Sequence, residues 1–163
     1  MSPKAIAPNP LAVEIVRILK RRKQTIATAE SITGGLLSGA LTDVAGSSAV
    51  FLGGLVTYSD PAKTKFLAIP KRILTKHTAV SETVAIAMAE SARAQFKSDF
   101  AISTTGVAGP GRAYGQKAGT VWVAIASAKE TVAVQLNLSG ARHEIRILTI
   151  ESALATFARI LAP

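Results

Sequence analysis

The hydrophobic pattern of this chain alternates along its length between the period of a helix and that of a strand. The first apolar residues are spaced so that they share one face of a helix: Leu11, Ile15, Ile18 and Leu19. Residues 25–29 follow as a short segment that is typical of a strand. Because helices that alternate with strands are typical of α/β proteins, the sequence predicts an α/β fold.

Later segments continue this alternation. Helices are predicted over residues 32–44, over residues 81–97 with Ser81 as the N-cap, and along a long apolar seam at residues 147–161. A shorter helix is predicted to open with Asp60 as its cap and Pro61 at its first position. Strands are predicted over residues 49–58, 100–104, 120–126 and 131–138, the last two as an antiparallel pair. The strand over 49–58 contains two glycines, which suits a buried strand that another segment approaches closely.

The length of 163 residues and the apolar content of 48% suit one domain with a sizeable core and exclude a disordered chain. We therefore expect a single domain over residues 1–163, in which residues 1–9 form an N-terminal lead. The lead lacks the apolar stretch of a signal peptide, and no apolar run approaches the length that spans a membrane. The absence of cysteine excludes a disulfide framework and a thiol nucleophile. These features predict a cytoplasmic protein with no membrane partner.

The formal net charge of +9 is not arranged as a nucleic-acid-binding surface. The densest basic run, residues 20–23, falls where the first helix should end, and the helix macrodipole favours cations there. The other basic residues are scattered, without the interleaved aromatic residues that single-strand binding requires. We therefore do not expect nucleic acid as a partner. The charge suits a small phosphorylated ligand, or it only aids solubility.

The run Ala29-Glu30-Ser31-Ile32-Thr33-Gly34-Gly35 joins a predicted strand to a predicted helix and offers a hydroxyl beside several backbone N–H groups. In a chain with no cysteine, two histidines and no metal-ligand spacing, Ser31 is the leading candidate nucleophile. A serine hydroxyl needs a base, and Lys63 is the side chain that could serve as one. Simpler roles stay open, because Ser31 could cap the next helix and Lys63 could lie on the surface. Glu30 could support the site or be a buried partner at the strand end.

The predicted helices bear on this chemistry. Lys63 would occupy the third position of the short helix, where the macrodipole favours a neutral amine, although Asp60 opposes that shift. The backbone N–H groups at the start of the Thr33-Gly34-Gly35 helix are candidates for stabilising an oxyanion.

Three places could bind a phosphate: that helix start, the Gly46-Ser47-Ser48 turn, and Arg142. Arg142 is the most suggestive, because it stands with His143 and Arg146 at the beginning of the last helix. The macrodipole disfavours cations there, so an anionic ligand or an acidic neighbour would explain their placement. Exposed residues screened by solvent are the alternative.

Six blocks occur in order between residues 29 and 122, within a similarity that spans roughly residues 10–160. They are Ala29-Glu30-Ser31-x-Thr33-Gly34-Gly35, Asp43-x-x-Gly46-Ser47-Ser48, Val56-Thr57-Tyr58-Ser59 with Lys63, Ala79-Val80-Ser81-Glu82, Thr105-Gly106-x-Ala108-Gly109-Pro110, and Gly119-Thr120-Val121-Trp122. With these blocks the chain resembles the CinA C-terminal domain family, whose characterised members are nicotinamide mononucleotide deamidases. The resemblance implies a single three-layer α/β/α sandwich with a mixed sheet that forms a homo-oligomer. It also implies hydrolysis of nicotinamide mononucleotide to nicotinic acid mononucleotide and ammonia, with no metal and no organic cofactor.

Carried over by motif, the resemblance implies a serine–lysine pair of Ser31 and Lys63, with Tyr58, Thr105 and Arg142 at the substrate site. The full set of expected catalytic residues is Ser31, Lys63, Tyr58 and Thr105. The expected substrate-binding residues are Thr33, Gly34, Gly35, Ser47, Ser48, Gly106 and Arg142.

The chain departs from the family pattern at Ile32, often a cysteine in relatives, where little effect is expected, and in two places that bear on function. Ala141 stands where many relatives have an aspartate before the arginine, and the loop over residues 111–118 lacks the usual glycine-rich run. The alternative function is therefore a catalytically idle nucleotide-binding or interaction module of the same fold.

Overall fold

The computed structural model describes residues 7–162, which form six α-helices, one 3₁₀ helix and five strands. In chain order these are α1 (Pro10–Arg22), β1 (Ile26–Glu30), α2 (Leu36–Thr42), the 3₁₀ helix η1 (Ser47–Ala49), β2 (Phe51–Val56), α3 (Asp60–Leu67), α4 (Lys71–His77), α5 (Glu82–Phe96), β3 (Phe100–Gly106), β4 (Thr120–Ala126), β5 (Thr131–Asn137) and α6 (Arg142–Leu161). Of the lead predicted over 1–9, residues 1–6 lie outside the described residues. Residues 7–9 precede α1, and Asn9 caps that helix through the N–H groups of Leu11 and Ala12.

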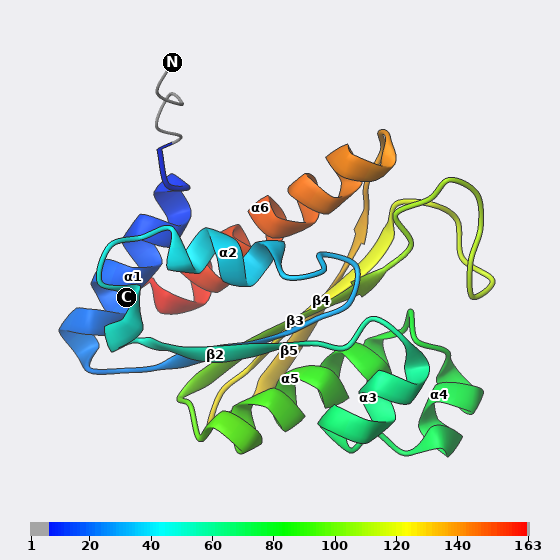
Figure 1. The fold of residues 1–163 in the computed structure, drawn as a ribbon, viewed down its shortest axis with the longest axis horizontal. Coiled ribbons are helices and arrows are strands. Elements are labelled where there is room, and N and C mark those ends of the chain that lie inside the picture. The colour runs from blue at the N-terminus through cyan, green and yellow to red at the C-terminus, as the bar shows by residue number, and fades with distance from the viewer. Residues whose placement is uncertain (1–6, 163) are drawn as a thin grey trace.

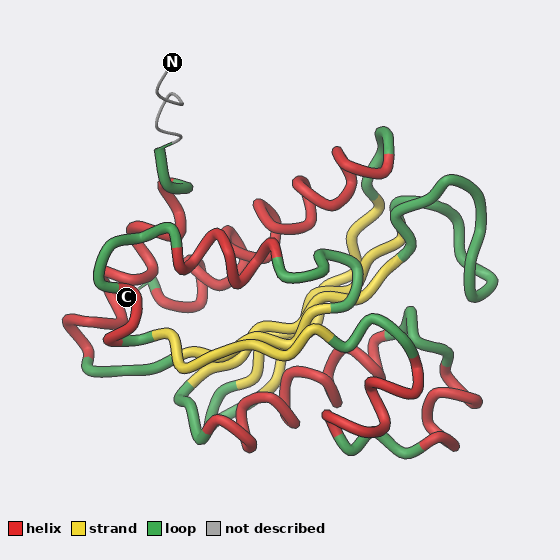
Figure 2. Tube along the Cα trace, in the orientation of Figure 1, coloured by secondary structure: helices red, strands yellow, loops and turns green. Residues whose placement is uncertain are grey.

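The five strands form one mixed sheet in the order β2-β1-β3-β4-β5. β1 pairs in parallel with β2 and β3, whereas β4 pairs antiparallel with β3 and β5. Figure 1 shows α1, α2 and α6 over one face of the sheet and α3, α4 and α5 over the other, and Figure 2 shows the same three layers. The predicted α/β/α sandwich with a mixed sheet is therefore confirmed. No helix within residues 7–162 is both long and apolar enough to cross a membrane.

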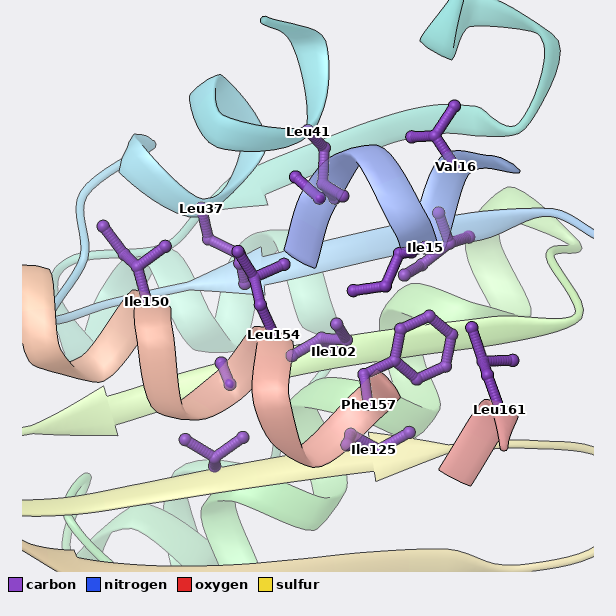
Figure 3. Packing of buried hydrophobic residues seen from close by; sticks show 14 of the residues in the cluster. Ile15, Val16, Leu37, Leu41, Ile102, Ile125, Ile150, Leu154, Phe157 and Leu161 are labelled. Carbon is purple, nitrogen blue, oxygen red and sulfur yellow. The ribbon is translucent and has the colours of Figure 1, made fainter. Parts of the chain in front are cut away.

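Large side chains fill the layer between the sheet and the helices α1, α2 and α6 (Figure 3). Ile102 of β3 and Ile125 of β4 pack there with Leu154 and Phe157 of α6. The ring of Phe157 meets that of Phe100 edge to face, with ring centroids 5.2 Å apart. This layer makes up most of the hydrophobic core.

The opposite face of the sheet consists mainly of small residues, because successive side chains of a strand point to opposite faces. Its buried alanines are Ala27, Ala29, Ala101, Ala124 and Ala126. Helix α5 packs on them with alanines of its own, Ala85, Ala89 and Ala92. The backbone of α5 therefore lies close to the sheet, where Ser103 donates a 2.6 Å hydrogen bond to the carbonyl of Ala85.

Several boundaries differ from the sequence prediction. The helix predicted over 32–44 begins only at Leu36, because Gly34 and Gly35 both adopt positive φ, at 60° and 100°, and form a turn. Helix α3 is capped by Ser59 rather than Asp60, so Lys63 occupies its fourth position instead of its third. The short helix α4 was not predicted.

Strand β2 lies at an edge of the sheet and is only half-buried, with Leu52 and Val56 exposed, so the prediction of a buried strand was wrong. The close approach at its two glycines is confirmed. A Cβ at Gly53 would meet the ring of Phe96, and a Cβ at Gly54 would meet Thr28. The antiparallel pair β4–β5 and the Ser81 cap of α5 are also confirmed.

Candidate active site

A pocket lies beyond the carboxyl ends of the parallel strands β1, β2 and β3, the usual position of ligand sites in open α/β sheets. Figure 1 shows the connection from β1 leading to α2 on one face and that from β2 leading to α3 on the other. The pocket is lined by Ser31, Ile32, Tyr58, Lys63, Ala79, Val80, Thr105, Gly106, Val107, Ala108, Gly109, Pro110, Ala113, Tyr114 and Arg142. Of the predicted site residues, the structure therefore brings together Ser31, Tyr58, Lys63, Thr105, Gly106 and Arg142.

Ser31 is the first residue after β1 and is only 8% exposed. Its N–H donates a 2.9 Å hydrogen bond to the carbonyl of Thr104 on the neighbouring strand β3. Arg146 of α6 holds the next two residues, because Nε donates to the carbonyl of Ile32 at 3.1 Å and Nη2 donates to that of Thr33 at 2.9 Å. The backbone around the candidate nucleophile is thus fixed from two sides.

Glu30 is fully buried and caps the start of α2. Its carboxylate accepts hydrogen bonds from the N–H groups of Gly35, Leu37 and Ser38 and from the hydroxyls of Thr33 and Ser38, at 2.6–3.0 Å. An anion at a helix N-terminus is favoured both by the free N–H groups and by the macrodipole. Of the two roles considered for Glu30, the structure supports that of a buried partner at the strand end. Glu30, and not Ser31, caps the helix.

This cap occupies the backbone and hydroxyl groups of the predicted substrate-binding residues Thr33, Gly34 and Gly35. The N–H of Gly35 and the hydroxyl of Thr33 are already bonded to Glu30, and the N–H of Gly34 donates to the carbonyl of Ser31. The start of α2 is thus saturated by the protein itself. None of the three residues lines the pocket in the described chain.

Ser47 and Ser48 do not line the pocket of the described chain either, so the structure does not bring them together with Ser31. They belong to η1, which precedes β2 and lies at the amino end of the strand, whereas Ser31 follows the carboxyl end of the parallel strand β1. The five residues of β1 separate the two ends by about 16 Å. The neighbouring Gly46 instead faces Lys20 of α1.

Lys63 is fully buried, with its amine at the base of the pocket. Nζ lies 3.1 Å from Oγ of Ser31, 2.9 Å from the carbonyl of Thr57 and 3.5 Å from the carbonyl of Tyr58. Burial lowers the pKa of Lys63 below its ordinary value of 10.5, and the nearby negative charge of Asp60 acts in the opposite direction. The neutral amine is therefore favoured more than in water.

A neutral amine can satisfy these contacts. An uncharged –NH₂ group has two N–H donors and one lone pair, and the three neighbours of Nζ are two carbonyls and one hydroxyl. The carbonyls can take both N–H groups, which directs the lone pair toward the proton of Ser31. A serine activated in this way can attack an electrophilic carbonyl carbon.

Arg142 reaches the mouth of the pocket from the start of α6. Nη1 donates to the carbonyl of Gly109 at 2.6 Å, and Nη2 donates to the hydroxyl of Tyr58 at 2.8 Å. These two contacts orient the guanidinium without any side chain from Ala141. Thr105 is buried in the pocket wall, and its hydroxyl donates to the carbonyl of Ala79 at 2.6 Å.

Two residues beside the pocket were missed from the sequence. Arg146 was noted only as a cation at a helix start, and its contacts with Ile32 and Thr33 explain it without an anionic ligand. Tyr114, in the loop between β3 and β4, lines the pocket although it lies in the segment that departs from the family pattern. Its place in that divergent loop was the only sequence signal.

The fold and the pocket together define a class of protein: a three-layer α/β/α domain with a buried serine–lysine pair beyond the carboxyl ends of its parallel strands. The chain belongs to the CinA C-terminal domain family, whose model matches residues 8–161. The family resemblance carried by the sequence blocks is therefore confirmed.

Individual relatives agree with this assignment. The chain is 43% identical over 150 residues to a CinA-like protein from Syntrophus aciditrophicus, a match that covers 91% of this chain and 36% of the relative. It thus spans about a third of the length of the curated relatives it matches.

Two solved structures are similar over almost their whole length. The competence/damage inducible protein CihA from Agrobacterium tumefaciens has a TM-score of 0.92 and 34% identity, with 98% of this chain and 100% of that chain covered. The competence damage-inducible protein A from Klebsiella pneumoniae has a TM-score of 0.89 and 35% identity, with 91% and 93% covered.

Proposed function

We propose that this chain hydrolyses the carboxamide of nicotinamide mononucleotide, giving nicotinic acid mononucleotide and ammonia in the recycling of pyridine nucleotides. Ser31 is the nucleophile and Lys63 is its base. The observation that carries the proposal is the buried amine of Lys63, 3.1 Å from Oγ of Ser31, in a pocket that also contains Arg142. The family resemblance supplies the substrate.

The reaction has two halves. As Oγ of Ser31 forms a bond to the carboxamide carbon, the neutral amine of Lys63 takes the hydroxyl proton. Lys63 then gives that proton to the departing nitrogen, the C–N bond breaks, and ammonia leaves an ester on Ser31. Water attacks the ester with Lys63 again as the base, which releases the carboxylic acid and restores the serine.

The N–H of Ile32 is our candidate donor to the oxyanion formed in each half. Ile32 directly follows the nucleophile and lines the pocket, and within residues 7–162 its N–H donates to no backbone carbonyl. The N–H groups of Gly35 and Leu37 cannot take this part, because Glu30 holds them. Removal of one oxyanion donor typically costs on the order of 100-fold in rate.

Arg142 is assigned to the phosphate of the substrate. In the described chain the pocket lining contains two basic residues, Lys63 and Arg142, and Lys63 must be neutral to act as a base. The guanidinium carries five N–H donors, and its contacts with Gly109 and Tyr58 leave others free for an anion. Ala141 favoured an idle binding module because it cannot orient Arg142 as an aspartate would. The contacts with Gly109 and Tyr58 orient Arg142 instead, which weakens that argument.

The test is release of ammonia from nicotinamide mononucleotide by the full chain, beside nicotinamide, nicotinamide riboside and the Ser31→Ala variant. We expect release from the mononucleotide alone, and its loss in Ser31→Ala with binding of the mononucleotide retained. Full turnover by Ser31→Ala would refute the nucleophile. Binding of the mononucleotide by the parent chain without ammonia release would favour the idle binding module.

A further inference from the structure

The chain contains two tyrosines, and both line the candidate active site. Tyr58 follows β2 and takes part in orienting Arg142. Tyr114 comes from the loop between β3 and β4, which extends beyond the ends of the strands (Figure 1). Its side chain is 47% exposed and has no part in the serine–lysine chemistry.

The backbone at Tyr114 is unusual for a large aromatic residue. Ala113 and Gln116 exchange two hydrogen bonds, at 3.0 and 2.9 Å, around the two central residues Tyr114 and Gly115. Both central residues have positive φ, at 51° and 73°. A two-residue turn of this kind favours asparagine followed by glycine, and a bulky residue at positive φ is uncommon. The turn therefore holds a tyrosine against local preference and presents its side chain to the pocket.

The negative charge of Asp60 acts on the other end of the side chain. Burial, together with that charge, raises the pKa of Tyr114, so the hydroxyl keeps its proton. Asp60 is the first residue of α3, the helix that carries Lys63. The side chain of Tyr114 thus lies in the same pocket as Lys63, near the start of the helix that carries the base.

The pocket offers no acidic side chain among the residues that line it in the described chain. A positively charged ring entering it would meet Arg142 and the amine of Lys63, which provide no electrostatic attraction for a cation. The face of an aromatic ring does, because its quadrupole is negative there. Tyr114 is the aromatic residue in the lining that is not engaged with Arg142.

We propose that Tyr114 is a substrate-binding residue whose ring provides the face on which a positively charged aromatic ring stacks. This inference rests on the proposed function, because the pyridinium of nicotinamide mononucleotide is such a ring. Tyr114 thereby selects the oxidised, cationic pyridine over a neutral ring that carries the same carboxamide, ribose and phosphate.

The test separates the ring from the turn. Tyr114→Asn places the favoured residue in the turn and removes the ring, whereas Tyr114→Phe keeps the ring and removes the hydroxyl. Each is made in the Ser31→Ala chain, and thermal unfolding checks that it folds. Calorimetry then gives Kd for nicotinamide mononucleotide and for its reduced dihydropyridine form, whose ring is neutral and not aromatic.

We expect Tyr114→Asn to weaken binding of the oxidised mononucleotide about fivefold. Binding of the reduced form should change by less than about twofold in Tyr114→Asn, and Tyr114→Phe should stay within about twofold of the parent for both ligands. Unchanged binding of the oxidised form by Tyr114→Asn, or an equal loss for both ligands, would overturn the role of Tyr114 alone. A parent chain that binds neither ligand would overturn the proposed function as well.

Discussion

Arg142 donates a 2.8 Å hydrogen bond from Nη2 to the hydroxyl of Tyr58, which joins the start of α6 to the end of β2. The same guanidinium bonds the carbonyl of Gly109 in the loop after β3. Three segments that are distant in sequence thus meet at one side chain. An exposed arginine is thereby held in one position beside the pocket.

Substitution of Arg142 should chiefly affect substrate binding. We expect Arg142→Ala to raise KM for nicotinamide mononucleotide about 10- to 100-fold with little change in kcat, because a charge-assisted hydrogen bond to phosphate is lost. Tyr58→Phe, which removes one partner of the guanidinium, should raise KM about threefold. Arg159→Ala, at the other end of the same helix, is the control and should leave both constants unchanged. A loss confined to kcat would contradict the assignment to phosphate.

The pH dependence of activity should report on Lys63 and its neighbour Asp60. Because the base must be neutral, kcat/KM should rise with pH through the pKa of Lys63, which burial lowers and Asp60 raises. In Asp60→Asn the opposing charge is gone, so the rising limb should move to lower pH. Tyr114→Phe keeps the charge of Asp60 and should leave the limb where it is. A limb that moves to higher pH in Asp60→Asn would exclude this electrostatic coupling.

Lys63 should also make stability depend on pH. Between its lowered pKa in the folded chain and the ordinary value of 10.5, the unfolded chain binds more protons than the folded chain. The free energy of unfolding should therefore rise with pH over that window. Lys63→Met removes this contribution and should flatten the rise while abolishing turnover, whereas Lys65→Met on the exposed side of α3 should do neither. Urea unfolding at a series of pH values measures the slope.

Glu30→Gln should destabilise the fold, although glutamine has nearly the same shape as glutamate. All five partners of Glu30 are donors, and the amide of Glu30→Gln would direct its own N–H groups at some of them. We expect a loss of about 2 kcal/mol and a fall in Tm of roughly 6 °C. Glu14→Gln, on the exposed face of α1, should change stability by less than about 0.5 kcal/mol. Thermal unfolding of both variants decides the point.

Local patterns predicted the elements whose boundaries depend on their own residues. No information from the rest of the chain was needed to predict three features: the Ser81 cap of α5, the basic end of α1 and the β4–β5 pair. The start of α2 could not be placed in this way, because two glycines continue the turn after Ser31. Once the helix starts at Leu36, its free N–H groups meet Glu30, so the error in the boundary also caused the error in the anion site.

The sequence motifs identified candidate site residues but did not show how those residues are arranged in space. The sequence assigned Ser31 and Lys63 to one site, and the structure brings their side chains to 3.1 Å, although their catalytic role remains a prediction. Ser47 was assigned to the same site because the sequence motif does not show how the strands pair. In the structure β1 and β2 pair in parallel, which places η1 at the opposite end of the sheet from Ser31. The partners of Arg142 were missed for the same reason, because Gly109 and Tyr58 come from other segments.

The hydrogen bonds from Arg146 to the turn after Ser31 have a consequence for biosynthesis. The contacts of Arg146 with Ile32 span 114 residues, so they cannot form while α6 is still inside the ribosome. Until then a nascent chain has its candidate nucleophile on a turn that lacks the tie from α6. The backbone after Ser31 therefore acquires its final setting only after α6 has emerged.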